Sequence, residues 1–121
     1  MEAHLVWKGS QREVYALVKK QRPIFEEDLH DSVPEQTKDK IDAYVKFLSD
    51  AKLPITNKHI SRKLQGYDNL FELKPKNVRI FYFFFVRHAV LISGCTKGPK
   101  KTNELDIERA EKLKRTFLSE K

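Results

Sequence analysis

An alternating segment near the start of the chain is followed by a short segment with helical features. In REVYALVK, residues 12–19, Val14, Ala16 and Val18 alternate with other side chains, a period of two that is typical of a half-buried strand. In QRPIFEEDLHD, Pro23 precedes a run of three acidic residues. Proline is tolerated in the first turn of a helix, and acidic side chains favour the positive end of the helix dipole. We therefore predict a strand and then a short helix.

A longer amphipathic helix is predicted for SVPEQTKDKIDAYVKFLSDA. Ser32 and Glu35 have the spacing of a capping box. Apolar residues then recur at helical spacing on one stripe, while the opposite face is charged. The stripe consists of Ile41, Tyr44, Val45 and Leu48. One side of this helix is expected to pack against a core.

Three strands are predicted in quick succession after a loop over LPITNKHISRKL. They cover about residues 70–73, 78–86 and 89–94. Their short connections favour antiparallel pairing. In the middle strand Ile80 and Tyr82 point to one face, whereas Arg79 and Phe81 point to the other. Apolar residues on both faces indicate a central strand.

A last helix completes the predicted fold. It begins near Asn103, and one stripe of it consists of Ile107, Ala110, Lys114 and Phe117. The predicted order, β-α-α-β-β-β-α, indicates an α+β fold in a single domain over residues 1–121, a length that one ordinary domain has. The helices are expected to cover one face of the sheet and to leave the other free.

Composition narrows the class of protein. Apolar residues make up 40% of the chain and charged residues 34%, so neither disorder nor a membrane protein is indicated. The longest apolar run, residues 80–86, is far shorter than the ~20 residues of a membrane helix. The start of the chain does not resemble a secretion signal, and the single cysteine, Cys95, excludes an internal disulfide. We therefore expect a cytoplasmic protein with no membrane partner.

Positive charge is concentrated in the C-terminal part. The net charge is +7, but residues 1–51 hold 8 Lys/Arg and 10 Asp/Glu, while residues 52–121 hold 16 and 7. No acidic residue occurs between Lys74 and Lys101. This distribution indicates a polyanionic partner for the C-terminal part.

The basic residues of this part are candidates for a phosphate-binding rim. An arginine within a strand is costly to bury without a partner, so Arg79 either reaches solvent at a strand end or points into a cleft for an anion. The absence of a nearby acid in the sequence favours the cleft. Adjacent strands could bring Arg79 to one edge together with further cations, where arginine offers a planar fork and lysine a mobile charge. Those cations are Lys74, Lys76, Lys97, Lys100 and Lys101.

Metal and cofactor motifs are missing from the sequence. The histidines, His4, His30, His59 and His88, are isolated, and no metal-ligand spacing surrounds Cys95. No phosphate-binding glycine loop and no pair of carboxylates in the basic segment occurs. We expect no cofactor and no metal, so any phosphodiester chemistry would use basic side chains.

Part of the chain resembles a known family. KLQGYDNLFELKPKNVRIFYFFFVRHAVLISGCTKGPKKTNELDIERAEKL resembles the RelE/ParE superfamily of type II toxins, nearest to its HigB-like, phage-derived branch. That branch has a K-L pair, an L-[WYF]-E-L-[RK] segment, an R-I-x-Y-F segment, an apolar strand, a lysine loop and a helix with [DE]-I-x-x-A. The matching positions are Lys63, Leu64, residues 70–74, Arg79, Ile80, Tyr82, Phe83, Lys97, Asp106, Ile107 and Ala110.

The resemblance implies a small, twisted antiparallel sheet packed against helices. It also implies a metal-independent endoribonuclease that cleaves messenger RNA on the ribosome, arrests translation and is held inactive by a cognate antitoxin, for which we expect a helix-turn-helix protein. The implied catalytic residues are Arg79, Lys97, Lys74 and Tyr82. Lys76, Arg87, Lys100 and Lys101 are the expected RNA-binding residues.

Two positions depart from the family pattern. Gly98 stands where relatives often have a second lysine, and Cys95 replaces a usual aromatic residue. Lys100 or Lys101 could supply the missing cation. Two alternatives to the nuclease therefore stay open, a gyrase inhibitor of the ParE-like branch and a non-catalytic basic protein that binds nucleic acid.

Overall fold

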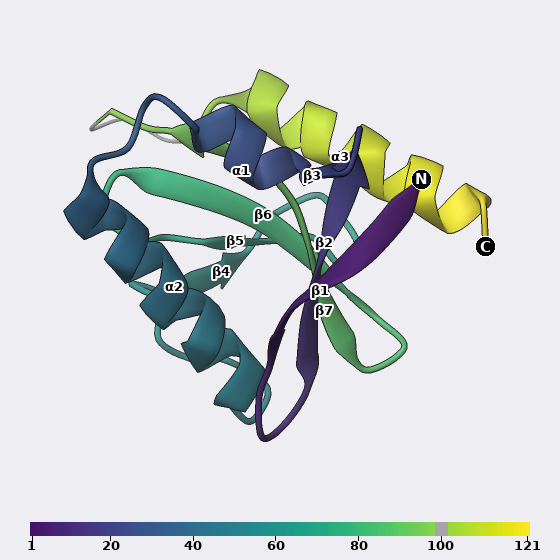
Figure 1. Cartoon of the computed structure of the whole chain (residues 1–121). Coiled ribbons are helices and arrows are strands. Elements are labelled where there is room, and N and C mark those ends of the chain that lie inside the picture. The colour runs from purple at the N-terminus through teal and green to yellow at the C-terminus, as the bar shows by residue number, and fades with distance from the viewer. Residues whose placement is uncertain (99–101) are drawn as a thin grey trace.

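The described residues of the protein fold into a seven-stranded sheet and three helices (Figure 1). We describe residues 1–98 and 102–121 of a computed structural model. The elements are β1 (Glu2–Lys8), β2 (Glu13–Lys19), β3 (Arg22–Pro23), α1 (Ile24–Leu29), α2 (Glu35–Asp50), β4 (Ser61–Lys63), β5 (Phe71–Leu73), β6 (Val78–Phe85), β7 (His88–Thr96) and α3 (Glu104–Ser119). The predicted α+β class is confirmed, and every predicted strand and helix is present. Strands β1, β3 and β4 were not predicted.

The sheet has the strand order β1-β2-β7-β6-β5-β4, and the short β3 pairs with β2. The strands β4 to β7 are joined by short connections and pair antiparallel, as predicted. Strands β2 and β7 pair parallel, with Val14 opposite Ala89 and Ala16 opposite Leu91. Parallel pairing needs a long connection, and the chain between these two strands, which contains both N-terminal helices, provides one.

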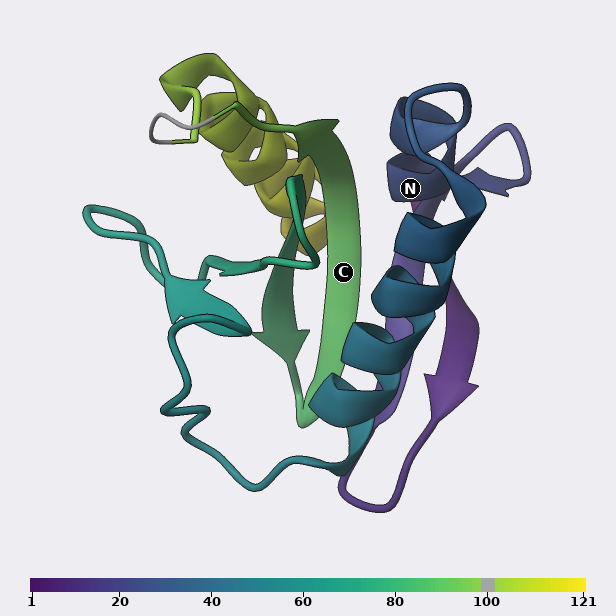
Figure 2. The ribbon, with the colours of Figure 1, turned by 90° about the vertical axis from the view of Figure 1, so that its left-hand side faces the viewer.

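Helices cover both faces of the sheet, so the expectation of one free face is wrong. On one face, Ile80 and Tyr82 of β6 belong to a core shared with α1 and α2. On the other face, Phe81 and Phe83 belong to a second core shared with α3. Figure 2 shows α2 and α3 on opposite sides of β7. A central strand covered on both sides explains the apolar residues on both of its faces.

The α3 stripe is buried as predicted, whereas the α2 cap differs from the prediction. All four stripe residues of α3, Ile107, Ala110, Lys114 and Phe117, are buried. The side chain of Asn103 caps α3 by accepting a hydrogen bond from the backbone N–H of Leu105 at 2.8 Å. Helix α2 begins after Pro34 and has no side-chain cap, so Ser32 does not form the predicted capping box. No helix in the described parts of the chain is long and apolar enough to cross a membrane.

Gly9, in the turn between β1 and β2, gives the first testable prediction. A Cβ atom at this position would lie 2.6 Å from the backbone carbonyl carbon of Ser49 at the end of α2. Because backbone cannot easily move away, Gly9→Ala is expected to lower the free energy of unfolding by about 1–3 kcal/mol in urea denaturation. A Cβ at Gly98 would meet nothing within 4 Å, so Gly98→Ala is the matched control. Equal stability of the two variants would contradict the prediction.

Candidate functional site

Strand register brings Arg62, Glu72 and Arg79 to one face of the sheet. Arg62 on β4 lies opposite Glu72 on β5, and Glu72 lies opposite Phe81 on β6. Arg79 is two residues from Phe81 and therefore shares its face, and Cys95 on β7 lies opposite Arg79. This is the face that α3 covers.

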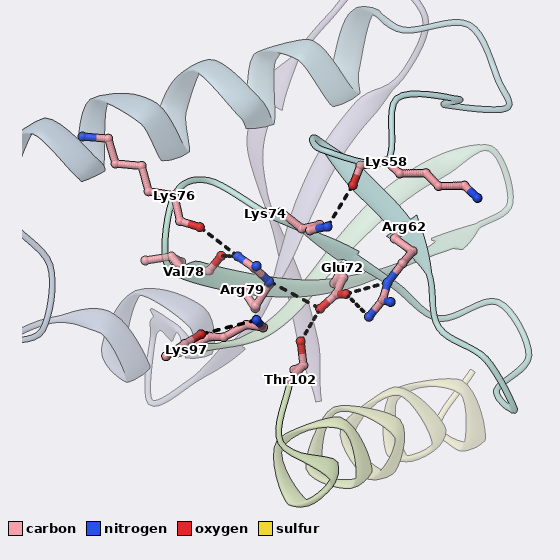
Figure 3. Close-up of polar contacts among 10 residues, drawn as sticks. Lys58, Arg62, Glu72, Lys74, Lys76, Val78, Arg79, Lys97 and Thr102 are labelled. Carbon is pink, nitrogen blue, oxygen red and sulfur yellow. Dashed lines mark hydrogen bonds and ion pairs between the residues drawn. The ribbon is translucent and has the colours of Figure 1, made fainter. Parts of the chain in front are cut away.

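Glu72 is the central acceptor of this region (Figure 3). It is fully buried, and its Oε2 accepts hydrogen bonds from Nε of Arg62 at 3.0 Å and from Nη2 of Arg62 at 2.6 Å. Its Oε1 accepts a hydrogen bond from Oγ1 of Thr102 at 2.9 Å and forms an ion pair with Nε of Arg79 at 3.8 Å. Glu72 therefore holds two guanidinium groups and connects them to the start of α3.

Sequence reasoning missed both Glu72 and Arg62. It looked for an acid after Lys74, but the partner of Arg79 comes from the neighbouring strand. One signal was available: Glu72 stands between Phe71 and Leu73 in a predicted strand, and an acid in a short apolar strand needs a partner when it is buried.

Arg79 is buried near the start of β6, with 8% of its surface exposed. Its Nη1 donates to the backbone carbonyls of Lys76 at 2.9 Å and Val78 at 2.7 Å. Burial lowers the pKa of Arg79, and the nearby Glu72 opposes this effect. Nε has no hydrogen-bond partner, and within residues 1–98 and 102–121 neither has Nη2. Because Nε is buried against Glu72, Nη2 is the donor of this guanidinium that is left for a ligand.

Lys74 follows β5 and is partly exposed. Its Nζ donates a hydrogen bond to the backbone carbonyl of Lys58 at 2.9 Å. Burial lowers the pKa of Lys74, and the positive charges of Arg79, Arg62 and Lys97 lower it further, against the opposing effect of Glu72. A lysine with a lowered pKa has more of the neutral amine that can accept a proton.

Lys97 joins this group of cations, because its positive charge acts on Lys74. It follows β7 and is partly exposed, and its backbone N–H donates to the carbonyl of Asn77 at 2.7 Å. Within residues 1–98 and 102–121, its Nζ donates to the carbonyl of Gly98 at 3.3 Å and to no other group. We call Arg62, Lys74, Arg79 and Lys97 the cation cluster. Arg62 and Arg79 pair with Glu72, and the charges of Glu72, Arg62, Arg79 and Lys97 all act on Lys74. Four positive charges with one paired carboxylate suit a phosphate backbone.

Lys76 and Arg87, two of the predicted RNA-binding residues, are not part of the cation cluster. In Figure 3 the side chain of Lys76 points away from Glu72, and only its carbonyl contacts Arg79. Arg87 lies in the turn between β6 and β7, at the other end of β6, which is on the order of 20 Å from Arg79. Lys100 and Lys101 lie outside the described residues.

Tyr82, a predicted catalytic residue, lies on the opposite face of the sheet from Arg79. It is 1% exposed, and its hydroxyl pairs with Oγ of Ser61 at 2.7 Å. Burial raises the pKa of Tyr82 to about 12. The structure thus places Tyr82 in the core beneath α2, because side chains alternate along a strand and even-numbered residues of β6 face that core.

The described structure bears on two further kinds of site, a reactive thiol at Cys95 and a metal site formed by His, Cys, Asp or Glu side chains. Burial raises the pKa of the Cys95 thiol to about 12, with a further contribution from Asp106, and this disfavours the nucleophilic thiolate. Among residues 1–98 and 102–121, no group of three His, Cys, Asp or Glu side chains could hold a metal ion.

Comparisons with known proteins add a family match and a structural similarity. Residues 28–115, more than half of the chain, match the protein family described as "Phage derived protein Gp49-like". The fold is similar to a chain in a crystal structure of the RelB-RelE antitoxin-toxin complex from Methanococcus jannaschii. The similarity has a TM-score of 0.48 and 18% identity and covers 60% of this chain and 82% of that one. No curated protein matches the chain.

Proposed function

The chain belongs to the phage-derived Gp49-like family, a family of RelE- and HigB-like toxins, and on this premise we propose that it is the toxin of a toxin–antitoxin pair and cleaves messenger RNA. The observation that carries the proposal is the cation cluster, in which Glu72 pairs with Arg62 and Arg79, and Lys74 lies within the influence of both arginines and of Lys97. Such a surface binds a polyanion, and the lowered pKa of Lys74 adds a group that can accept a proton.

The proposed reaction uses the 2′-hydroxyl of the RNA as nucleophile. The neutral amine of Lys74 accepts the 2′-hydroxyl proton, and the 2′ oxygen forms a bond to phosphorus. The positive charge of Arg79 and its Nη2 donor stabilise the negative charge of the phosphorane. The bond from phosphorus to the 5′ oxygen breaks, and the ammonium of Lys97 donates its proton to that oxygen. The products are a 2′,3′-cyclic phosphate and a 5′-hydroxyl.

In the proposed assignment, RNA binding and catalysis are carried out by different residues. Arg62 has a side chain that is 44% exposed and one edge held by Glu72, so it can contact a neighbouring phosphate of the same RNA strand. Tyr82 has no part in the reaction because it lies in the opposite core. The substrate would be a messenger in the act of translation, as the resemblance to the HigB-like branch implies, and this places the toxin in the cytoplasm.

A partner protein follows from the same proposal. An antitoxin with an acidic segment could neutralise the cation cluster and keep the nuclease inactive, since opposite charges steer and orient such contacts. We expect a small helix-turn-helix protein encoded next to the toxin. Co-expression with that protein should restore growth to cells that the toxin arrests.

The role of Lys74 as base predicts a pH dependence of cleavage. The rate should rise with pH as Lys74 loses its proton, with a midpoint below the ordinary lysine value of 10.5. Lys74→Arg keeps the charge but stays protonated, so cleavage in translating extract should fall by about 10²–10⁴-fold and the rise with pH should disappear. Lys58→Arg is the matched control, because only the backbone carbonyl of Lys58 contacts the site. An unchanged pH profile in Lys74→Arg would assign the base elsewhere.

A further inference from the structure

A groove of about 780 Å³ lies between α1, α2 and β1. Strand β1 is one end of the strand order, whereas β4, which carries Arg62, is the other end. The groove is therefore separate from the cation cluster. Its apolar lining includes Val6, Trp7, Phe25, Leu29, Val33 and Ile41. Trp7 is 42% exposed, which leaves a large apolar ring accessible to solvent.

Carboxylates without partners surround this apolar lining. Glu26, Asp39 and Asp42 line the groove and are exposed, and none of them forms an ion pair within the described residues. The basic group Lys38 also lines the groove, but it pairs with Glu35 at 3.8 Å. In a chain of net charge +7, the rim of this groove is locally acidic.

We propose that this groove binds a basic amphipathic helix of a partner protein. Apolar side chains on one face of the helix would fill the groove over Trp7 and Phe25, as in other helix-in-groove complexes. Lysine and arginine side chains beside that face would pair with Asp39, Asp42 and Glu26. The same carboxylates repel nucleic acid, so the occupant is a protein segment. This surface is independent of the proposed nuclease function.

Trp7 offers a direct measurement, because it is the single tryptophan of the chain and it lines the groove. Two synthetic helical peptides without aromatic residues would be compared, both with the same leucine face, one with lysine and one with glutamate on the polar face. The lysine peptide should shift Trp7 emission to shorter wavelength and bind at least about tenfold more tightly than the glutamate peptide. Non-specific attraction to a chain of net charge +7 would favour the glutamate peptide instead, so the sign of the preference is decisive.

Charge reversal locates the binding surface. The lysine peptide should bind the double variant Asp39→Lys with Asp42→Lys at least about tenfold more weakly than it binds the wild type. The glutamate peptide should bind this variant more tightly. The matched control, Asp68→Lys with Glu108→Lys, changes the net charge equally at exposed residues outside the groove and should leave the preference intact. The proposal is overturned if neither peptide alters Trp7 emission, if the glutamate peptide binds as tightly, or if both double variants behave alike. RNA cleavage enters none of these readouts, so they do not depend on the nuclease proposal.

Discussion

Cleavage of messenger RNA in translating extract is expected to fall by about 10²–10³-fold when Arg79 is replaced by alanine, because the variant loses the positive charge and the Nη2 donor that would stabilise the phosphorane. Arg79→Lys is expected to remain far below the wild type, since a lysine ammonium cannot reproduce the planar fork of a guanidinium. Growth arrest in cells should weaken in parallel.

The control for Arg79 is Arg87→Ala. Arg87 is an exposed arginine at the other end of β6, so its loss removes the same charge without touching the cation cluster. Circular dichroism should show that all variants are folded. If folded Arg79→Ala still cleaves RNA at close to the wild-type rate, the site assignment is wrong.

The wild type itself distinguishes the two alternative functions. If it leaves RNA intact but causes DNA damage, the protein belongs with the gyrase inhibitors. Salt-dependent binding of nucleic acid without either effect would indicate a non-catalytic binding protein.

Glu72→Ala is expected to lower the free energy of unfolding by about 3–5 kcal/mol, the largest effect on stability that we predict. The substitution removes the carboxylate that pairs with Arg62 and Arg79 and accepts from Thr102, and it leaves the buried charge of Arg79 without an opposite charge. Urea denaturation followed by circular dichroism measures the effect.

Glu35→Ala is the matched control for Glu72. Glu35 is an exposed glutamate that forms only a surface ion pair with Lys38, and such pairs contribute about 0–1 kcal/mol. The loss of unfolding free energy in Glu72→Gln should lie between those of Glu72→Ala and Glu35→Ala, because the amide keeps an acceptor for Thr102 but not the charge. A loss below 1 kcal/mol in Glu72→Ala would mean that solvent reaches the guanidinium of Arg79 and that the carboxylate does not hold the cluster together.

Local periodicity was sufficient to predict the parts of the fold that depend on neighbouring residues. The stripe of α3 was predicted residue by residue, including Lys114, whose Nζ is buried beside Glu111 at 2.8 Å. Strand β1 escaped prediction because its sequence, EAHLVWK, shows no clear alternation of buried and exposed positions in the structure either. The coverage of both sheet faces depends on how α2 and α3 cross the sheet, which no local pattern encodes.

The candidate site likewise combines features that local periodicity predicts with features that depend on strand pairing. Alternation along β6 was enough to separate Tyr82 from Arg79, and the structure places them on opposite faces. The family resemblance nevertheless grouped them, since a motif records spacing along the chain and not direction. The pairing of Arg79 with Glu72 requires the register of β5 against β6, which sequence reasoning did not supply.

The parallel pairing of β2 with β7 determines when the sheet can be completed during translation. It joins residues 14–16 to residues 89–91, so the sheet stays open until most of the chain has left the ribosome. The hydrogen bond from Thr102 to Glu72 comes later still. A nascent chain would therefore lack a finished cation cluster while its own messenger is being read, and the proposed cleavage activity would begin only after synthesis is complete.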